Sequence, residues 1–302
     1  MLIVITGPTA VGKTKRSIEL AHEMNGEIIS ADSMQVYKHM DIGTAKIKKE
    51  EMEGVPHHLI DILEPTEEFN VFKFKELCNE CIRDIESRGK TPIIAGGTGF
   101  YIQAVLKDVD FTEAETDFKY RAELEALAEN EGAGALHRLL SEVDPEAAKE
   151  IHENNIKRTI RALEYYKLTG EKISEHNQTQ RMKKSGIDYK YYVLNMDRSK
   201  LYERINLRVD LMREEGLIDE VSKIFEMGVT DGMTSMQGIG YKEFVEACRM
   251  KDESAPLSEI YSQLSGKDFD DIFEKIKIDT RHFAKRQLTW FRREEDVIWI
   301  EH

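Results

Sequence analysis

Cysteine and proline are scarce in this sequence, with three cysteines and six prolines among 302 residues. So few cysteines exclude a disulfide-stapled scaffold and predict a protein of the reducing cytoplasm. The low proline content argues against a flexible, proline-rich linker. Apolar stretches stay well below the roughly 18–20 residues that a membrane-spanning helix needs. Because residues 1–6 lack a basic segment, we do not expect a secretion signal at this end.

Basic residues are outnumbered, since 43 Lys and Arg face 57 Asp and Glu, giving a net charge of −14. This balance argues against bulk, nonspecific nucleic-acid binding but leaves room for a local basic track. Hydrophobic residues make up 40% of the chain, which is enough for a core. The length predicts one large domain, or a core domain that carries an insertion.

Hydrophobic periodicity divides the chain into an α/β pattern and a helical block. Strand-like runs alternate with helical stretches at the start, and this pattern predicts an α/β fold with a doubly wound parallel sheet. A purely helical block follows and then the α/β pattern returns, so we expect an inserted all-helical domain. The predicted strands are residues 2–6, 27–31, 58–63, 91–95, 189–195 and 297–300, and the predicted helices are 13–24, 71–88, 117–130, 134–143, 145–152, 155–168, 198–227 and 279–293.

A glycine-rich motif, GPTAVGKT at residues 7–14, matches the P-loop pattern G-x-x-x-x-G-K-[ST] between a predicted strand and a predicted helix. Its backbone N–H groups are expected to hold phosphate oxygens, with Lys13 adding positive charge and Thr14 offering a hydroxyl to Mg²⁺. The alternative is a glycine turn that binds nothing. The motif predicts binding of a di- or triphosphate, such as the nucleotide ATP, by Gly7, Pro8, Thr9, Ala10, Val11, Gly12, Lys13 and Thr14.

The acidic pair that follows a strand in ATPases and GTPases is missing, because the strand at 91–95 leads into Gly96-Gly-Thr-Gly99 instead. The best-placed carboxylate is Asp32, at the C-terminal end of the second strand, where ligands bind in open α/β sheets. Asp32 could ligate a metal, bind a substrate hydroxyl or act as a base. The simpler interpretation is a helix cap or a turn residue.

Together with these motifs, SADSMQVY at 30–37, MDIGTAK at 40–46 and GGTGFY at 96–101 resemble the tRNA dimethylallyltransferases. Later segments fit the same family, and the match covers essentially the whole chain. Met34 and Phe100 stand where many members carry Arg and Leu, and the zinc-finger extension of eukaryotic members is lacking, as in the shorter bacterial form. The resemblance implies a P-loop NTPase-like catalytic core, residues 1–111 and 188–302, and a helical insertion, 112–187, that contacts tRNA.

The family transfers a dimethylallyl group from its diphosphate to the N6 amine of the adenine just 3′ of the anticodon. Negative charge would then develop on the leaving diphosphate, where Lys13, the loop amides and Mg²⁺ on Thr14 can stabilise it. The resemblance assigns Asp32 as the base that takes the amine proton. Thr98 carries over as a hydroxyl beside the reacting centre, although a plain turn residue is an equal alternative. The predicted catalytic residues are thus Asp32, Thr98 and Lys13.

The target adenine must leave the anticodon loop to react. Two basic clusters could hold the RNA, one on the helix at 155–168 and one interleaved with aromatics on the last helix. Without the family match, solvated helix faces would be the simpler interpretation. The predicted tRNA contacts are Asp32, Ser33, Met34, Gln35, Thr98, Arg121, Lys157, Arg158, Arg161, Gln237, Gly240, Lys242, Arg281, Lys285, Arg286, Gln287 and Arg292.

Two motifs look like sites but are interpreted as structural. Cys78-x-x-Cys81 lies in an unbroken helical apolar stripe, which favours core packing. His57-His58 precedes a predicted strand and has no metal-ligand partners nearby in sequence. Competing functions are a small-molecule P-loop kinase, a tRNA-binding NTPase without transfer chemistry, and a prenyltransferase acting on free adenine nucleotide. We expect a monomer with no membrane contact and no obligate protein partner.

Overall fold

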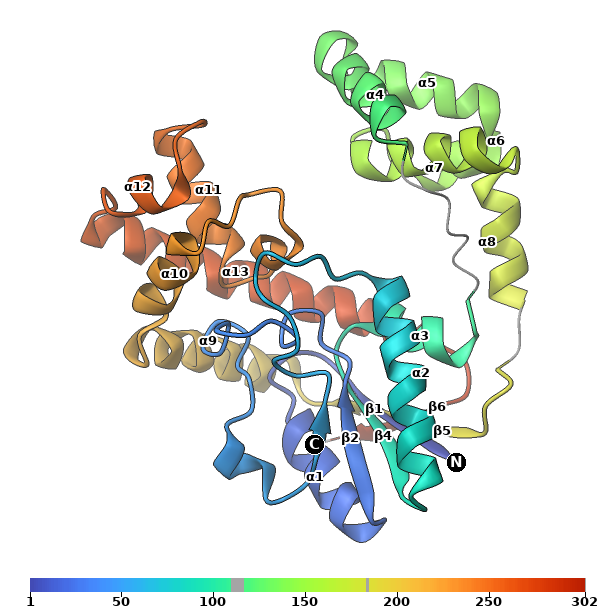
Figure 1. The fold of residues 1–302 in the computed structure, drawn as a ribbon, viewed down its shortest axis with the longest axis vertical. Helices are drawn as coiled ribbons and strands as arrows, with labels where there is room; N and C mark the ends of the chain where they lie inside the picture. Colours follow the sequence, from blue (N-terminus) through green and yellow to red (C-terminus); the bar gives the residue numbers. More distant parts are fainter. Residues whose placement is uncertain (110–116, 183–184, 302) are drawn as a thin grey trace. The chain divides into compact units, whose positions relative to one another are not determined.

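A computed structural model of the chain describes residues 1–109, 117–182 and 185–301 (Figure 1). The chain forms two compact units: Met1–Val105 with Ile187–His302, called here the P-loop unit, and Leu106–Gly186, called the helical unit. The boundary predicted at residues 111 and 112 lies outside the described residues. At its other end the helical unit ends at Gly186, where the sequence pattern placed the last residue at 187.

In the P-loop unit the described residues form a six-stranded sheet with the order β3-β2-β4-β1-β5-β6, and every neighbouring pair is parallel. Strands β1 and β2 are buried along their whole length, although β2 carries Glu27 and Ser30 beside its apolar residues. The predicted α/β fold with a parallel sheet is confirmed. The strands are β1 Leu2–Thr6, β2 Gly26–Ser30, β3 His57–His58, β4 Thr91–Gly96, β5 Tyr189–Asn195 and β6 Val297–Glu301.

The strand predicted at residues 58–63 is wrong beyond its first residue. Strand β3 ends at His58, because Leu59 and Asp61 adopt left-handed backbone angles with φ of 62° and 55°. These angles end the hydrogen-bond ladder between β2 and β3, and further along the chain Leu63 pairs with Tyr37 only through an isolated bridge. The run of apolar, partly β-branched residues indicated a buried strand, but local backbone conformation decided otherwise.

Helices α1 (Lys13–Glu23) and α2 (Val71–Ser87) pack against the sheet (Figure 1). Helix α2 begins at Asn70, whose side chain accepts a hydrogen bond from the backbone N–H of Lys73. Cys78 is fully buried on the apolar face of α2 and Cys81 is half-buried, as the core interpretation of this motif requires. In the described part of the chain, no group of three or more His, Cys, Asp or Glu side chains could hold a metal.

The second half of the P-loop unit is mainly helical. The helices predicted over 198–227 are two in number and are separated at Gly216, which has a φ of 99°. The predicted helix at 279–293 begins earlier, at Gly266, behind a capping box of Ser265 and Asp268 that the sequence analysis overlooked. Helices α3, α11 and α12 were not predicted. The bounds are α3 Gly99–Leu106, α9 Arg198–Glu214, α10 Leu217–Glu226, α11 Lys242–Lys251, α12 Leu257–Tyr261 and α13 Gly266–Phe291, with short 3₁₀ turns at Lys49–Met52 and Thr234–Gln237.

The helical unit has its own apolar core, which includes Leu124, Leu136 and Leu163. Its helices start where the sequence supplies capping oxygens, since Asp117, Asp144 and Asn155 each accept a hydrogen bond from a backbone N–H of the first turn. The four predicted helices are confirmed within three residues at each end, and a fifth, α8, was missed. The helices are α4 Phe118–Glu131, α5 Ala133–Val143, α6 Pro145–Glu150, α7 Ile156–Thr169 and α8 Ile173–Met182.

None of the helices described in the two units is both long and apolar enough to cross a membrane.

Candidate active site

The P-loop connects β1 to α1 in the predicted strand–loop–helix arrangement. Gly12 has a φ of 104°, a conformation that favours glycine, and it immediately precedes the first helical residue. The side chain of Lys13 folds back over the loop, where its Nζ donates hydrogen bonds to the carbonyl oxygens of Gly7 (3.1 Å) and Pro8 (2.8 Å). The loop thus presents a helix N-terminus and a cation at one place, as binding of an anion requires.

Gln287 of helix α13 joins two loops of the site. Its Oε1 accepts a hydrogen bond from the backbone N–H of Thr9 in the P-loop, and its Nε2 donates one to the carbonyl of Gly97, both at 2.9 Å. A Cβ atom at position 97 would lie 2.2 Å from that Nε2, so only glycine allows this approach. Gln287 was predicted as a tRNA contact, whereas the structure buries it and uses both ends of its amide to hold the loops.

Arg208 of helix α9 adds a second cation that the sequence analysis missed. Its Nη1 lies 3.5 Å from Oγ1 of Thr9, and the guanidinium lines a cavity of about 270 Å³ together with Lys13 and Asp32. Burial and then the charge of Arg208 lower the pKa of Lys13 to about 8, against the opposing effect of Asp32. Burial also lowers the pKa of Arg208, followed by repulsion from Arg204. Two partly buried cations on one cavity form a site suited to a multiply charged anion.

Asp32 and Thr98 follow neighbouring strands, β2 and β4, and line the same cavity. The backbone N–H of Thr98 donates to the carbonyl of Ala31 at 3.3 Å, which places the two loops side by side. The Oδ1 atom of Asp32 accepts a hydrogen bond from the N–H of Met34 at 2.9 Å. Asp32 is therefore a turn residue as well, but a carboxylate has four lone-pair positions and can also face a substrate.

Several other predicted RNA contacts line this cavity, although their polar groups also have partners in the protein. Lys242 donates to Asp279 at 2.9 Å, and Gln237 donates to the carbonyl of Asp231 at 2.7 Å. The backbone N–H of Gly240 donates to Glu243 at 2.8 Å. The predicted contacts that line the cavity are Asp32, Ser33, Met34, Thr98, Gln237, Lys242, Arg286 and Gln287.

Gln35 does not line this cavity but an adjoining one of about 60 Å³, together with Lys13, Thr14 and Asp32. Thr14 itself is exposed at the first turn of α1. Protein sites often bind Mg²⁺ through one or two side chains plus the phosphates of the substrate. The Thr14 hydroxyl on this small cavity fits a Mg²⁺ ion that arrives with a diphosphate, rather than a cage made by the protein alone.

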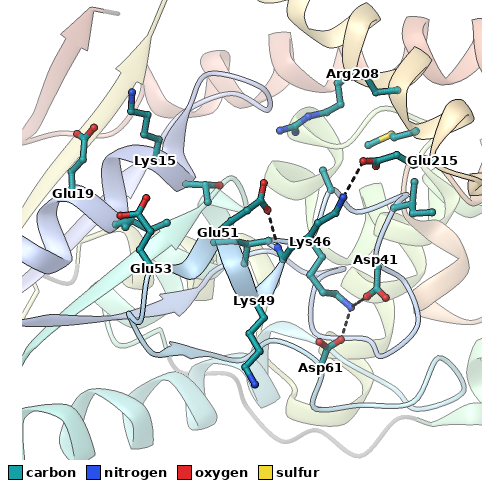
Figure 2. A pocket seen from close by; sticks show the side chains of 18 residues that line it. Lys15, Glu19, Asp41, Lys46, Lys49, Glu51, Glu53, Asp61, Arg208 and Glu215 are labelled. Atoms are coloured by element: carbon teal, nitrogen blue, oxygen red, sulfur yellow. Dashed lines mark hydrogen bonds and ion pairs between the residues drawn. The ribbon is translucent and has the colours of Figure 1, made fainter.

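A larger groove of about 1100 Å³ opens on the other side of Thr14 and Arg208 (Figure 2). Side chains of both signs line it, including Lys15, Lys49 and Glu215. Since Thr14 and Arg208 face this groove as well as the cavities at Asp32, the P-loop is reached from two sides.

The basic residues of helix α13 are placed on different surfaces. Lys285 and Arg286 line an open depression of about 470 Å³ beside Trp290, and Arg292 is exposed at the end of the helix. Arg281 instead donates to Oδ1 of Asn206 at 2.6 Å within the protein. An RNA-facing role of these residues stays a prediction.

In the helical unit, Lys157, Arg158 and Arg161 are exposed on α7, as their spacing predicted. Arg121 and Arg161 both donate to Oε2 of Glu164, at 2.7 and 3.1 Å, and this carboxylate is fully buried. The buried Glu164 carboxylate thus orients the guanidinium groups of both Arg121 and Arg161. Their contact with RNA stays a prediction.

Comparisons with known proteins find relatives over nearly the whole chain. A sequence model of the family described as IPP transferase matches residues 35–294. A tRNA dimethylallyltransferase of Lachnoclostridium phytofermentans is 60% identical over 300 residues, covering 99% of this chain and 91% of the relative. The crystal structure of a full-length tRNA isopentenylpyrophosphate transferase from Bacillus halodurans is 46% identical, with a TM-score of 0.69 over 99% of this chain and 89% of that one.

A third comparison reaches across a larger evolutionary distance. A eukaryotic dimethylallyltransferase captured acting on tRNA is 32% identical, with a TM-score of 0.80 over 99% of this chain and 73% of that one. Since the P-loop, the Asp32 carboxylate and the Thr98 turn meet in one place, and since the likeness to these relatives extends over nearly the whole chain, this protein belongs to the tRNA dimethylallyltransferase family.

Proposed function

We propose that this chain transfers the dimethylallyl group of dimethylallyl diphosphate to the N6 amine of the adenine next to the anticodon, on its 3′ side, in tRNA, releasing diphosphate. Membership of the family makes it a tRNA prenyltransferase. The strongest structural support is that one cavity is lined by a cation at the P-loop, Lys13, and by a carboxylate at a strand end, Asp32. One group suits the leaving diphosphate and the other suits the attacking amine.

Breaking the C1–O bond leaves both electrons of that bond on the diphosphate oxygen. Lys13, Arg208 and the P-loop amides lie where this charge would develop, and they are held in place before the reaction begins. Bound Mg²⁺ would neutralise further charge, with Thr14 as its ligand from the protein. The unusual task of this P-loop is therefore to hold a leaving group.

Adenine N6 is a weak nucleophile because its lone pair is delocalised into the ring. As the N6–C1 bond forms, one amine proton must leave, and Asp32 is the carboxylate on the cavity that can accept it. Thr98 lies across the cavity on the neighbouring strand end, where its hydroxyl can hydrogen-bond to the reacting groups. An adenine presented here would have been taken out of the anticodon loop.

The test is incubation of the protein with radiolabelled dimethylallyl diphosphate and one acceptor at a time: bulk tRNA, AMP or ATP. Label should enter tRNA and yield a prenylated adenosine on digestion. Label in AMP or ATP but not in tRNA would instead identify an enzyme of free nucleotides. Use of ATP as a phosphoryl donor, without incorporation of label, would identify a kinase.

We further propose that the protein acts as a monomer in the cytoplasm. All three cysteines are free thiols, which suits a reducing compartment. Size-exclusion chromatography coupled to light scattering measures the oligomeric state directly, and a mass near 34.9 kDa is expected.

A further inference from the structure

One wall of the substrate cavity is a loop without regular secondary structure. Gly43, Thr44 and Ala45 line the cavity that Asp32 and Thr98 also line. The segment from residue 40 to 46 contains neither helix nor strand, so its shape depends on individual contacts rather than on a hydrogen-bond ladder. Whatever holds this loop therefore controls the shape of the cavity.

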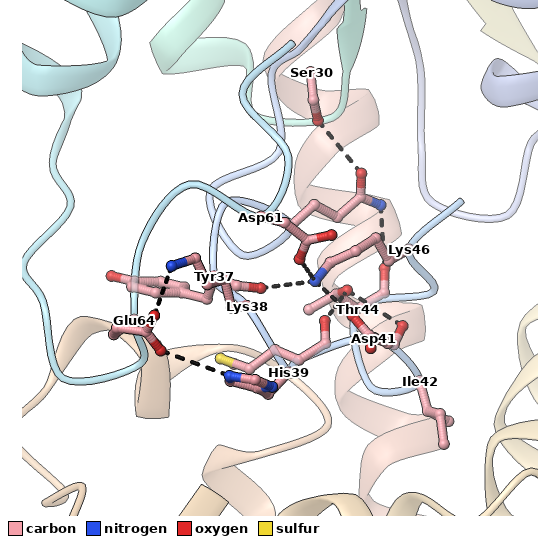
Figure 3. Close-up of polar contacts among 12 residues, drawn as sticks. Ser30, Tyr37, Lys38, His39, Asp41, Ile42, Thr44, Lys46, Asp61 and Glu64 are labelled. Carbon is pink, nitrogen blue, oxygen red and sulfur yellow. Dashed lines mark hydrogen bonds and ion pairs between the residues drawn. The ribbon is translucent and has the colours of Figure 1, made fainter. Parts of the chain in front are cut away.

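Lys46 closes the loop from inside the protein (Figure 3). Its side chain is 4% exposed, and its Nζ donates to the carbonyl of Tyr37 at 2.7 Å, to Oδ1 of Asp41 at 2.6 Å and to Oδ1 of Asp61. An ammonium group has three protons, so these three acceptors satisfy it. Asp41 and Asp61 are half-exposed and balance its charge. Lys46 thus connects three points that are up to 24 residues apart in sequence, since 61 − 37 = 24.

The loop in turn orients Gln35, a residue predicted to contact the tRNA. Gln35 Nε2 donates to the carbonyl oxygens of Thr44 (3.3 Å) and Ala45 (3.4 Å), which directly precede Lys46. Gln35 Oε1 accepts from Oγ of Ser30 at 3.3 Å (Figure 3). The loop carbonyls therefore fix which end of the Gln35 amide is the donor, and with it the hydrogen-bonding pattern of the small adjoining cavity that Gln35 and Asp32 both line.

A second anchor holds the other half of the same loop. Glu220 of helix α10 accepts hydrogen bonds from three consecutive backbone N–H groups, those of Asp41 (2.9 Å), Ile42 (2.7 Å) and Gly43 (3.0 Å). The hydroxyl of Tyr241 also donates to Glu220, at 2.6 Å. Because this anchor is independent of Lys46, loss of Lys46 should loosen the loop locally without releasing it from the fold.

We propose that Lys46 is a positioning residue for base recognition: its buried ammonium group holds the loop of residues 41–46 in the shape that orients the Gln35 amide beside Asp32. The inference rests on the proposed transfer to adenine. Lys46 touches neither substrate; it acts through Thr44, Ala45 and Gln35. Arginine should replace it poorly, because a planar guanidinium cannot direct protons to three acceptors arranged around a point.

The test compares Lys46→Met with a matched control, Lys38→Met, on the same segment. Lys38 is half-exposed and pairs with Glu64 at 2.6 Å, away from the cavity. Single-turnover transfer at saturating tRNA should be about 10²-fold slower in Lys46→Met, since misplacement of a binding group by about 1 Å costs that much. Binding of dimethylallyl diphosphate should be unchanged in both variants, and Lys38→Met should transfer at the wild-type rate.

A double variant that combines Lys46→Met with Gln35→Ala distinguishes a positioning role of Lys46 from a purely structural one. If Lys46 acts through Gln35, the double variant should be no slower than the slower single variant. If the double variant instead lost transfer rate by the product of the two single losses, the inference would be overturned. Normal transfer by Lys46→Met would overturn it as well. Should Lys46→Met fail to fold, Asp61→Asn weakens one of the three contacts of Lys46 by removing the charge of the acceptor at a half-exposed position, and an intermediate loss of transfer with unchanged diphosphate affinity is expected. Transfer by Asp61→Asn at the wild-type rate would then overturn the inference about Lys46. If the wild-type protein did not modify tRNA at all, the proposed function itself would be rejected.

Discussion

In the P-loop unit the buried carboxylate of Glu27 has partners on both oxygens: Arg88 contacts both, Lys90 donates to Oε1 at 2.6 Å, and the imidazole of His58 lies 2.8 Å from Oε2. In the helical unit the buried carboxylate of Glu164 is bound through Oε2 only, while its Oε1 has no hydrogen-bond partner among the described residues. The two arginines on Glu164 remain 37% and 44% exposed.

The two carboxylates also differ in their surroundings. Glu27 stands at the beginning of β2, whereas Asp32 follows its end, about 17 Å away along the strand. Its charge network thus fixes the sheet far from the chemistry. In the helical unit the buried carboxylate lies beneath exposed arginines, so the same kind of ion pair prepares a basic surface. Substitutions in the P-loop unit should therefore change the chemical step or stability, and those on α7 should change RNA affinity.

The largest effect is expected for Asp32→Asn. The amide keeps the size of the side chain but cannot take the amine proton, so transfer should slow by about 10²–10⁴-fold. Equilibrium binding of dimethylallyl diphosphate should barely change, because that ligand is held at the P-loop. Single-turnover transfer and diphosphate binding are measured together, with Arg158→Ala as the contrasting variant in the helical unit. Collapse of diphosphate affinity with normal transfer at saturation would make Asp32 a phosphate-site residue instead.

A smaller loss, of stability rather than activity, is expected for Glu27→Gln. The amide cannot pair with Arg88 and Lys90 as a charge, and we expect the free energy of unfolding to fall by about 2 kcal/mol. Transfer by the folded protein should be unaffected because the site lies at the other end of β2. Urea unfolding provides the measurement. Glu86→Gln, at a half-exposed position with a 3.6 Å contact to the N-terminal amine, is the control and should unfold like the wild type.

Acid should remove the contribution of Glu27. The hydrogen bond from Arg88, against the opposing effect of burial and with help from Lys90 and His58, holds the pKa of Glu27 well below its ordinary value of 4.5. A carboxyl group whose pKa is lowered by folding stabilises the protein above the ordinary pKa, and this contribution is lost as pH falls below it. The gap in stability between the wild type and Glu27→Gln should be constant near neutrality and shrink below about pH 4.5. A gap that widened in acid would contradict the assignment.

The smallest effect is expected on the salt dependence of tRNA binding. Each phosphate contact made by Lys157 or Arg158 releases counterions, so alanine at either position should reduce the slope of log K against log salt by about 1. Transfer at saturating tRNA should stay normal. Lys149→Ala is the control, because this exposed residue of α6 pairs with Glu146 at 2.6 Å. Unchanged slopes in both α7 variants would remove this face from the RNA site.

Most of the site's framework follows from local sequence signals. The glycine spacing around Lys13 predicted the P-loop because those backbone angles depend on neighbouring residues. Asp32 and Thr98 were predicted at one edge because the carboxyl ends of parallel strands meet there. Local sequence signals failed at residues 58–63, where left-handed backbone angles at Leu59 and Asp61 interrupt a run of apolar residues that predicted a strand.

The remaining contacts join residues that are far apart in sequence. Arg208 reaches Thr9 across 199 positions, and Gln287 reaches the same residue across 278. Nothing near these side chains distinguishes them from solvent-facing residues of charged helices, so Arg208 was missed and Gln287 was predicted only as an RNA contact. Helix periodicity indicates which face is apolar, but it carries no information about which distant loop a polar side chain will meet.

The sequence by itself determined the P-loop, the parallel sheet, the separate helical unit and the carboxylate at the strand end, because each depends on local spacing or on a general rule of chain topology. Only the tertiary structure decided that Lys46 is buried among three oxygens, that Glu220 holds three consecutive amides, and that Gln287 ties the P-loop to Gly97. The physical reason is that a buried polar group must find partners, and those partners are set by packing rather than by neighbours along the chain.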